Sequence, residues 1–135
     1  MSDAVDNNKK EPRIAVVDDE PAIRKSLIRL LGAAGMQVHA YASGREMVDA
    51  CKAIQFDCGL IDLQMPGLNG FQVFEELRRT DCRMPVIIMT ASGDPVVRKR
   101  ASELGIDLLL LKPLDGEVLL RSIKNLVSRV ELKQI

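Results

Sequence analysis

The sequence predicts an α/β fold in which helices cover both faces of a doubly wound, five-stranded parallel sheet. Five short apolar runs have strand length, four of them are almost continuously apolar, and amphipathic helical patterns separate them. Such alternation gives parallel strands joined by right-handed crossovers, which leaves few topologies. Among these we expect the strand order 2-1-3-4-5, which is taken from known doubly wound sheets and is not deduced from the residues.

One domain accounts for most of the chain. Residues 1–12 are polar and end in proline, so we expect a flexible tail there, then a domain over 13–131 and a short C-terminal end over 132–135. We expect the second strand at an edge of the sheet and the four-leucine run in the core. The predicted strands are residues 14–17, 37–41, 58–61, 86–89 and 108–111.

The segments between the strands have the 3.6-residue period of amphipathic helices. Apolar residues follow this period in four stretches: Ile23, Leu27, Leu30, Leu31 and Ala34; Met47, Cys51 and Ile54; Val97, Ala101 and Leu104; Leu119, Ile123, Leu126, Val127 and Val130. Ser43 and Glu46 have the spacing of a capping box. Other helix boundaries carry residues typical of first and last turns: Pro21, Pro95, Gly35 and Gly105.

The composition excludes several classes of protein. Of 135 residues, 47% are apolar and 28% are charged, with a net charge of zero, which argues against a nonspecific nucleic-acid or membrane surface. No apolar run could span a bilayer. The three cysteines form no CxxC pair, so we expect reduced, buried thiols in a cytoplasmic protein. The single histidine, His39, excludes a histidine-based metal site.

Polar residues end four of the five predicted strands. Asp18 and Asp19 follow the first strand, Asp62 ends the third, Thr90 the fourth, and Lys112 the fifth. In parallel sheets, ligands bind at the carboxyl ends of the strands, so we expect these side chains to lie in one cleft.

The chemistry of this set points to a phosphoryl group. Three carboxylates in one cleft repel each other by roughly 3 kcal/mol per pair at ~5 Å and an effective dielectric constant of 20. A hard cation such as Mg²⁺, which takes one or two carboxylates and keeps several waters, would relieve that repulsion. With an ammonium at Lys112 and a hydroxyl at Thr90, the cleft is predicted to accept a phosphoryl group on Asp62, the nucleophile of an acyl-phosphate reaction.

Four segments together resemble a bacterial response-regulator receiver domain, over about residues 13 to 130: VVDDEP, LIDLQMPGLNG, VIIMTASGD and LLLLKP. The resemblance implies a flavodoxin-like fold and a phosphoacceptor at Asp62. It implies Mg²⁺ bound by Asp18 through water, by Asp19, by Asp62 and by the backbone carbonyl of Gln64. Lys112 would pair with phosphoryl oxygens, Thr90 would be the switch hydroxyl, and the Lys112–Pro113 bond is expected to be cis.

The resemblance also implies partners. A sensor histidine kinase or phosphotransfer protein would donate the phosphoryl group. A downstream protein or a second copy would bind the surface formed by the helix near 97–104, the strand 108–111 and the last helix. No direct contact with nucleic acid or membrane is expected, and no enzymatic activity beyond self-phosphorylation and slow self-dephosphorylation. The SGD that follows Thr90 is most similar to receivers that precede a helix-turn-helix output domain.

Leu109 departs from the pattern of the family. Receivers usually carry Tyr or Phe at this position, three residues before the lysine, and its ring reorients with the threonine. We therefore expect phosphorylation with an altered conformational readout. A degenerate receiver that acts as a constitutive interaction module is the alternative. A Mg²⁺-dependent phosphohydrolase is disfavoured, because position 64 is Gln where such enzymes need a second acid and no cap insertion is present.

Overall fold

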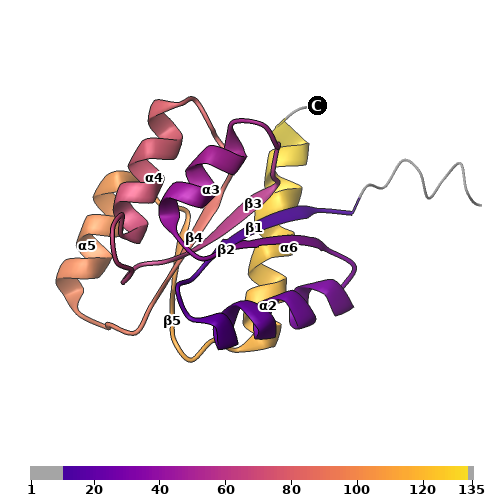
Figure 1. The fold of residues 1–135 in the computed structure, drawn as a ribbon, viewed down its shortest axis with the longest axis horizontal. Helices are drawn as coiled ribbons and strands as arrows, with labels where there is room; N and C mark the ends of the chain where they lie inside the picture. Colours follow the sequence, from indigo (N-terminus) through magenta and orange to yellow (C-terminus); the bar gives the residue numbers. More distant parts are fainter. Residues whose placement is uncertain (1–10, 134–135) are drawn as a thin grey trace, which may run out of the picture.

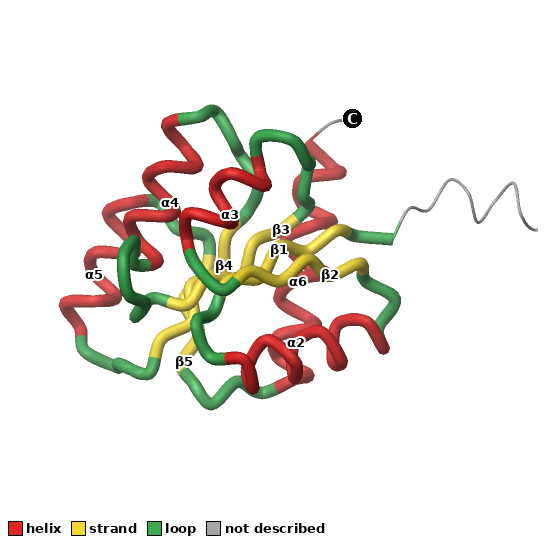
Figure 2. The backbone as a smooth tube through the Cα atoms, viewed as in Figure 1, coloured by secondary structure: helices red, strands yellow, loops and turns green. Residues whose placement is uncertain are grey.

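The computed structural model describes residues 11–133 and contains a five-stranded parallel sheet in the predicted order, β2-β1-β3-β4-β5. Strands and helices alternate along the chain (Figures 1 and 2). The strands are β1 (Arg13–Val17), β2 (Gln37–Tyr41), β3 (Cys58–Asp62), β4 (Val86–Thr90) and β5 (Leu108–Leu111). The helices are α2 (Pro21–Ala33), α3 (Gly44–Cys51), α4 (Gly70–Arg79), α5 (Pro95–Leu104) and α6 (Gly116–Lys133).

The sheet separates two hydrophobic cores, because successive side chains of a strand point to opposite faces. On one face Ile14 and Leu60 pack with residues of α2 and α6. On the other face Val17 and Ile61 pack with residues of α3 and α4. All four of these strand residues are fully buried, as the continuous apolar runs predicted for strands covered on both faces.

The prediction that the four-leucine run lies in the core holds only in part: Leu108 and Leu110 pack against one core and Leu109 against the other, but none is fully buried. β5 is an edge strand that pairs only with β4, so the run is half-buried, and Leu111 is 45% exposed. β2 forms the other edge, as predicted, and His39 within it is half-buried. A continuous apolar run therefore identified the strand but not its depth.

The helix ends follow the sequence signals with one exception. Pro21 and Pro95 begin α2 and α5, and Gly35 and Gly105 have φ of 85° and 80° after the last turns. The Ser43 hydroxyl accepts a hydrogen bond from the Glu46 amide, but the Glu46 carboxylate accepts from that hydroxyl and not from the Ser43 amide. A full capping box, which we did not predict, begins α4 at Asn69 and Gln72.

Cysteine burial also differs from the prediction. Cys58 is fully buried in β3, whereas Cys51 and Cys82 are only half-buried. The predicted N-terminal tail and C-terminal end lie mostly outside the described residues. Among the helices that the structure describes, none combines the length and the apolar character needed to cross a membrane.

Candidate functional site

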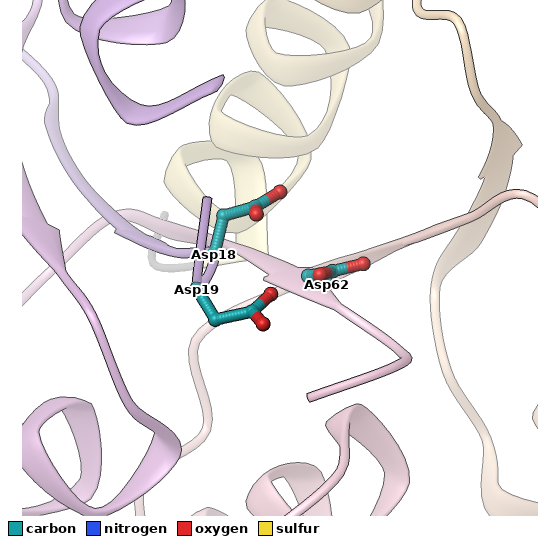
Figure 3. Close-up of side chains that lie close together, drawn as sticks. All are labelled: Asp18, Asp19 and Asp62. Carbon is teal, nitrogen blue, oxygen red and sulfur yellow. The ribbon is translucent and has the colours of Figure 1, made fainter. Parts of the chain in front are cut away.

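Three carboxylates meet at the carboxyl end of the sheet (Figure 3). One oxygen from each of Asp18, Asp19 and Asp62 lies within 4.8 Å of the other two. Asp18 is fully buried, Asp62 is 3% exposed, and Asp19 is open to solvent. The cluster is therefore accessible from one side only.

Strand register produces this cluster. Val17 in β1 pairs with Ile61 in β3, so the next residues along the chain, Asp18 just after β1 and Asp62 at the end of β3, reach the same level of the sheet. The Glu20 amide donates to Asp18 Oδ1 at 3.0 Å and fixes the carboxylate. Arg24 in the first turns of α2 donates to the Asp18 carbonyl at 2.7 Å, a contact that the sequence analysis missed.

Lys112 supplies the positive charge of the site. Its amide donates to the Thr90 carbonyl at 2.8 Å, which continues the β4–β5 ladder by one residue. Its Nζ then lies 2.9 Å from Asp18 Oδ2 and 3.1 Å from Asp62 Oδ1. The Lys112–Pro113 bond is cis, as expected. One ammonium thus bridges two buried carboxylates that come from different strands.

The electrostatics of Asp62 reflect this crowding. Burial, together with the nearby Asp18 carboxylate, raises the pKa of Asp62 to about 6, although the hydrogen bond from Lys112 opposes the shift. Desolvation acts to lower the pKa of Lys112, but its bonds to Asp18 and Asp62 outweigh it and leave that pKa raised. The site therefore holds more negative charge than one ammonium offsets.

Thr90 is fully buried at the end of β4, and its hydroxyl is already engaged. It accepts a hydrogen bond from the Ser92 amide at 3.0 Å and donates to the side-chain oxygen of Gln64 at 3.4 Å. The second contact links the loop after β3 to the end of β4. The sequence analysis considered only the backbone carbonyl of Gln64 and missed this side-chain contact.

The loop after β3 passes close to the nucleophile candidate. Gly67 has φ of 75°, which only glycine adopts at little cost, and it turns the loop back. A Cβ on Gly70 would lie 2.8 Å from the Asp62 carbonyl oxygen and 2.9 Å from Leu63 Cα. Gly70 therefore lets α4 begin directly against the end of β3.

Comparison with known proteins identifies the family. Residues 14–124 match the model of the response regulator receiver domain. The chain belongs to the response-regulator receiver family. This receiver is 32% identical to the transcriptional regulatory protein FixJ of Bradyrhizobium diazoefficiens over 87% of its length and 58% of that protein's. It is 36% identical to the response regulator MprA of Mycolicibacterium vanbaalenii, over 87% of this chain and 51% of MprA.

Comparison with solved structures supports the same family. The chemotaxis protein CheY4 of Vibrio cholerae superposes with a TM-score of 0.82 at 26% identity, over 87% of this chain and 99% of that one. Full-length FixJ superposes with a TM-score of 0.83 at 31% identity, over 91% and 61%. The receiver spans little more than half the length of the curated relatives named here.

The acidic cluster of this receiver fits a hard divalent cation. Its three side chains offer only oxygen donors, and two of them are buried beside each other with excess negative charge. These properties match Mg²⁺ better than a soft metal, which would select sulfur or imidazole.

Leu109 of the receiver pairs in register with Ile88 and lies half-buried against the core on the α3–α4 face. It has no ring and no polar atom, so it cannot form the hydrogen bonds or stacking of Tyr or Phe. Any coupling between this position and Thr90 must depend on packing alone.

Proposed function

We propose that residues 13–131 form a phosphoacceptor receiver domain in which Asp62 accepts a phosphoryl group from a phosphohistidine. The donor would be a sensor histidine kinase or a phosphotransfer protein. One observation carries the proposal: a carboxylate fixed at the end of a buried strand faces two further acids and an ammonium at 3.1 Å. Family membership supports the same conclusion.

In the transfer, an Asp62 carboxylate oxygen attacks phosphorus as the phosphorus–nitrogen bond of the donor breaks, and the departing imidazole takes a proton. Asp62 is held for in-line attack by β3, and Lys112 neutralises charge on the phosphoryl oxygens. Mg²⁺, held by Asp18, Asp19, Asp62 and the Gln64 carbonyl, would supply further positive charge to those oxygens. The protein contributes position and charge rather than new covalent chemistry.

The proposed readout starts at Thr90. On phosphorylation its hydroxyl would leave Gln64 and donate to a phosphoryl oxygen, which carries more negative charge than an amide oxygen. The output surface would be formed by α5, β5 and α6, and would bind a downstream protein or a second copy. An exposed large apolar residue lies in each of these elements: Val96 at 71%, Leu111 at 45% and Val118 at 39%.

Intact mass after incubation with acetyl phosphate and Mg²⁺ tests the proposal. We expect the wild-type chain to gain one phosphoryl group and Asp62→Asn to gain none. Asp49→Asn is the matched control, since Asp49 is an exposed residue of α3 whose carboxylate pairs with the exposed Lys52, and it should behave as the wild type. Failure of a folded wild-type chain to gain mass, or an equal gain by Asp62→Asn, would refute phosphorylation at Asp62.

A constitutive interaction module is the second candidate, and Leu109 is the observation that favours it. Amide NMR shifts distinguish the two. A switch should show shifts in α5 and β5 when phosphoryl-mimicking beryllium fluoride is added with Mg²⁺. A constitutive module should show shifts confined to the neighbourhood of Asp62.

A further inference from the structure

A pair of cysteines lies at the end of the sheet opposite Asp62. Cys51 is the last residue of α3, and Cys82 follows the end of α4, a helix that packs beside α3 (Figure 1). The two thiols lie next to each other, because each is the largest influence on the pKa of the other, and both side chains pack beside the same core. Both are half-buried, and both line the same open cavity of about 630 Å³, so a small molecule can reach them.

The end of α4 fixes the position of Cys82. Asp81 adopts φ of 65°, its amide donates to the Arg78 carbonyl, and the Cys82 amide donates to the Leu77 carbonyl at 2.9 Å. These bonds form a Schellman motif, which reverses the chain and returns the following side chain to the helix. Cys82 accordingly packs against the core that contains Leu77. The motif thus holds Cys82 at the cavity that Cys51 also lines.

The surroundings favour a thiolate at Cys82. The hydrogen bond from Cys51 lowers the pKa of Cys82 against the opposing effect of burial, and the Met84 amide and the guanidinium groups of Arg78 and Arg83 act in the same direction. Arg78 is held in place because it donates to the Cys82 carbonyl at 2.8 Å and lies 4.4 Å above the Phe74 ring. The same hydrogen bond, with burial, raises the pKa of Cys51, which keeps its proton.

We propose that Cys51 and Cys82 form a redox-sensitive dithiol that a hydroperoxide converts to an intramolecular disulfide. The Cys82 thiolate attacks the terminal peroxide oxygen; a sulfur–oxygen bond forms, the oxygen–oxygen bond breaks, and the departing oxyanion takes a proton. Cys51 then loses its proton and attacks the Cys82 sulfenic sulfur, which releases water. Overall, two thiols are oxidised to one disulfide. The hydroperoxide is reduced to an alcohol and one water, or to two waters if it is hydrogen peroxide.

Cys58 is an internal control for this reaction. It is fully buried in β3, and burial raises the pKa of its thiol to about 12. It should stay reduced under conditions that oxidise the pair, because reactive thiols are accessible and deprotonated. The proposal does not rest on phosphorylation, since neither cysteine belongs to the acidic site.

Trypsin places the three cysteines in separate peptides. Cys51 lies in peptide 46–52, Cys58 in 53–78 and Cys82 in 80–83. The cleavage sites that release these peptides follow Arg45, Lys52, Arg78, Arg79 and Arg83. The full chain, first reduced and freed of reductant, is treated with one equivalent of hydrogen peroxide. Remaining thiols are then alkylated in denaturant, and the digest is analysed without reduction. We expect peptides 46–52 and 80–83 joined by a disulfide, peptide 53–78 fully alkylated, and a monomer on a non-reducing gel.

Two variants assign the roles. In Cys51→Ser, which keeps a hydroxyl donor beside Cys82, dimedone should trap a sulfenic acid on peptide 80–83. In Cys82→Ser, Cys51 should remain a thiol at the same dose. Absence of the linked peptides in the wild type, links to peptide 53–78 in equal amount, or a dimer as the main product would overturn the proposal. These wild-type readouts decide the matter even if a variant does not fold.

Discussion

The two ends of the sheet hold their reactive groups on different supports. At the carboxyl end, Asp18, Asp62 and Thr90 end or follow adjacent strands and are at most 3% exposed. At the opposite end, Cys51 and Cys82 stand at the ends of two helices and are half-buried. The first set is fixed by the hydrogen-bond ladder of the sheet, and the second by a helix cap and by packing between helices.

The carboxylates and the thiols therefore become reactive in two different ways. The strand ends bring like charges together under burial, so the acidic site is destabilised until a cation offsets the negative charge. The helix ends bring two thiols together where a reagent can enter, and one of them, Cys82, is favoured as a thiolate. We therefore expect substitutions at the carboxyl end to have large effects on stability, and those at the opposite end to have small ones.

Loss of Lys112 should have the largest effect. Lys112→Met leaves the buried Asp18 and Asp62 carboxylates without their shared ammonium, and removing one partner of a buried ion pair costs about 3–5 kcal/mol. Urea unfolding at pH 7 without Mg²⁺ measures the loss. The matched control is Lys52→Met, which removes an exposed pair with Asp49 and should change stability by less than about 1 kcal/mol. Equal effects of the two substitutions would contradict the comparison between the ends.

The close approach of α4 gives the next effect. Gly70→Ala places a methyl group 2.8 Å from the Asp62 carbonyl oxygen, and the backbone must shift, which should cost about 1–3 kcal/mol. Gly32→Ala is the control, because a Cβ on Gly32 in α2 meets no atom within 4 Å and should stabilise the helix by about 0.5–1 kcal/mol. Thermal unfolding should move in opposite directions for the two variants; a tolerated Gly70→Ala would show that this contact is not tight.

Stability should depend on pH through Asp62 in the absence of Mg²⁺. The folded state raises its pKa from 3.8 to about 6, so the fold binds this proton more tightly than the unfolded chain does. The stabilisation that Asp62 contributes is therefore complete below about pH 4 and is lost as pH rises through about 6. The difference between a pKa of 3.8 and one of about 6 corresponds to at most ~3 kcal/mol.

Asp62→Asn should remove that pH slope. At pH 7 in EDTA the variant should be more stable than the wild type by about 1–3 kcal/mol, and near pH 4 the two should converge. Denaturant midpoints at several pH values provide the measurement, with Asp49→Asn as the exposed control. A wild-type chain that is more stable than Asp62→Asn at pH 7 without Mg²⁺ would show that Lys112 fully compensates the site.

The sequence predicted the acidic end better than the opposite one for a physical reason. Parallel strands place their carboxyl ends at the same end of the sheet, so recognising the strands and adopting the known strand order brought Asp18, Asp62, Thr90 and Lys112 together. Contacts between side chains did not follow from that rule. The bond between Gln64 and Thr90 depends on how the loop after β3 folds, which no local pattern specifies.

Burial depth was the other quantity that local patterns did not give. Cys51 falls on an apolar helical stripe, which indicates the direction of the core, but its place at the end of α3 leaves it half-exposed. Likewise the leucines of β5 predicted a strand buried on both faces, while the strand order leaves it at an edge. The period of apolar residues indicates which side of an element faces the core. How deeply a residue is buried depends on where its element lies in the fold.

The smallest predicted effect concerns the turn before Cys82. Asp81 has φ of 65°, a conformation that costs a residue with a Cβ more than it costs glycine. Asp81→Gly should therefore stabilise the protein by about 0.5 kcal/mol, after allowance for the greater freedom of glycine in the unfolded chain. The lost ion pair with Arg83 is exposed and should contribute little. Differential scanning calorimetry on reduced protein measures the shift.

The matched control applies the same change where the backbone is helical. Asp49→Gly in α3 relieves no left-handed conformation and should destabilise the protein by about 0.5–1 kcal/mol. Opposite signs for the two Asp→Gly changes would establish that the backbone at Asp81 is the source of strain at this end. If Asp81→Gly is as destabilising as Asp49→Gly, the Asp81 side chain itself holds the turn, and the position of Cys82 depends on it.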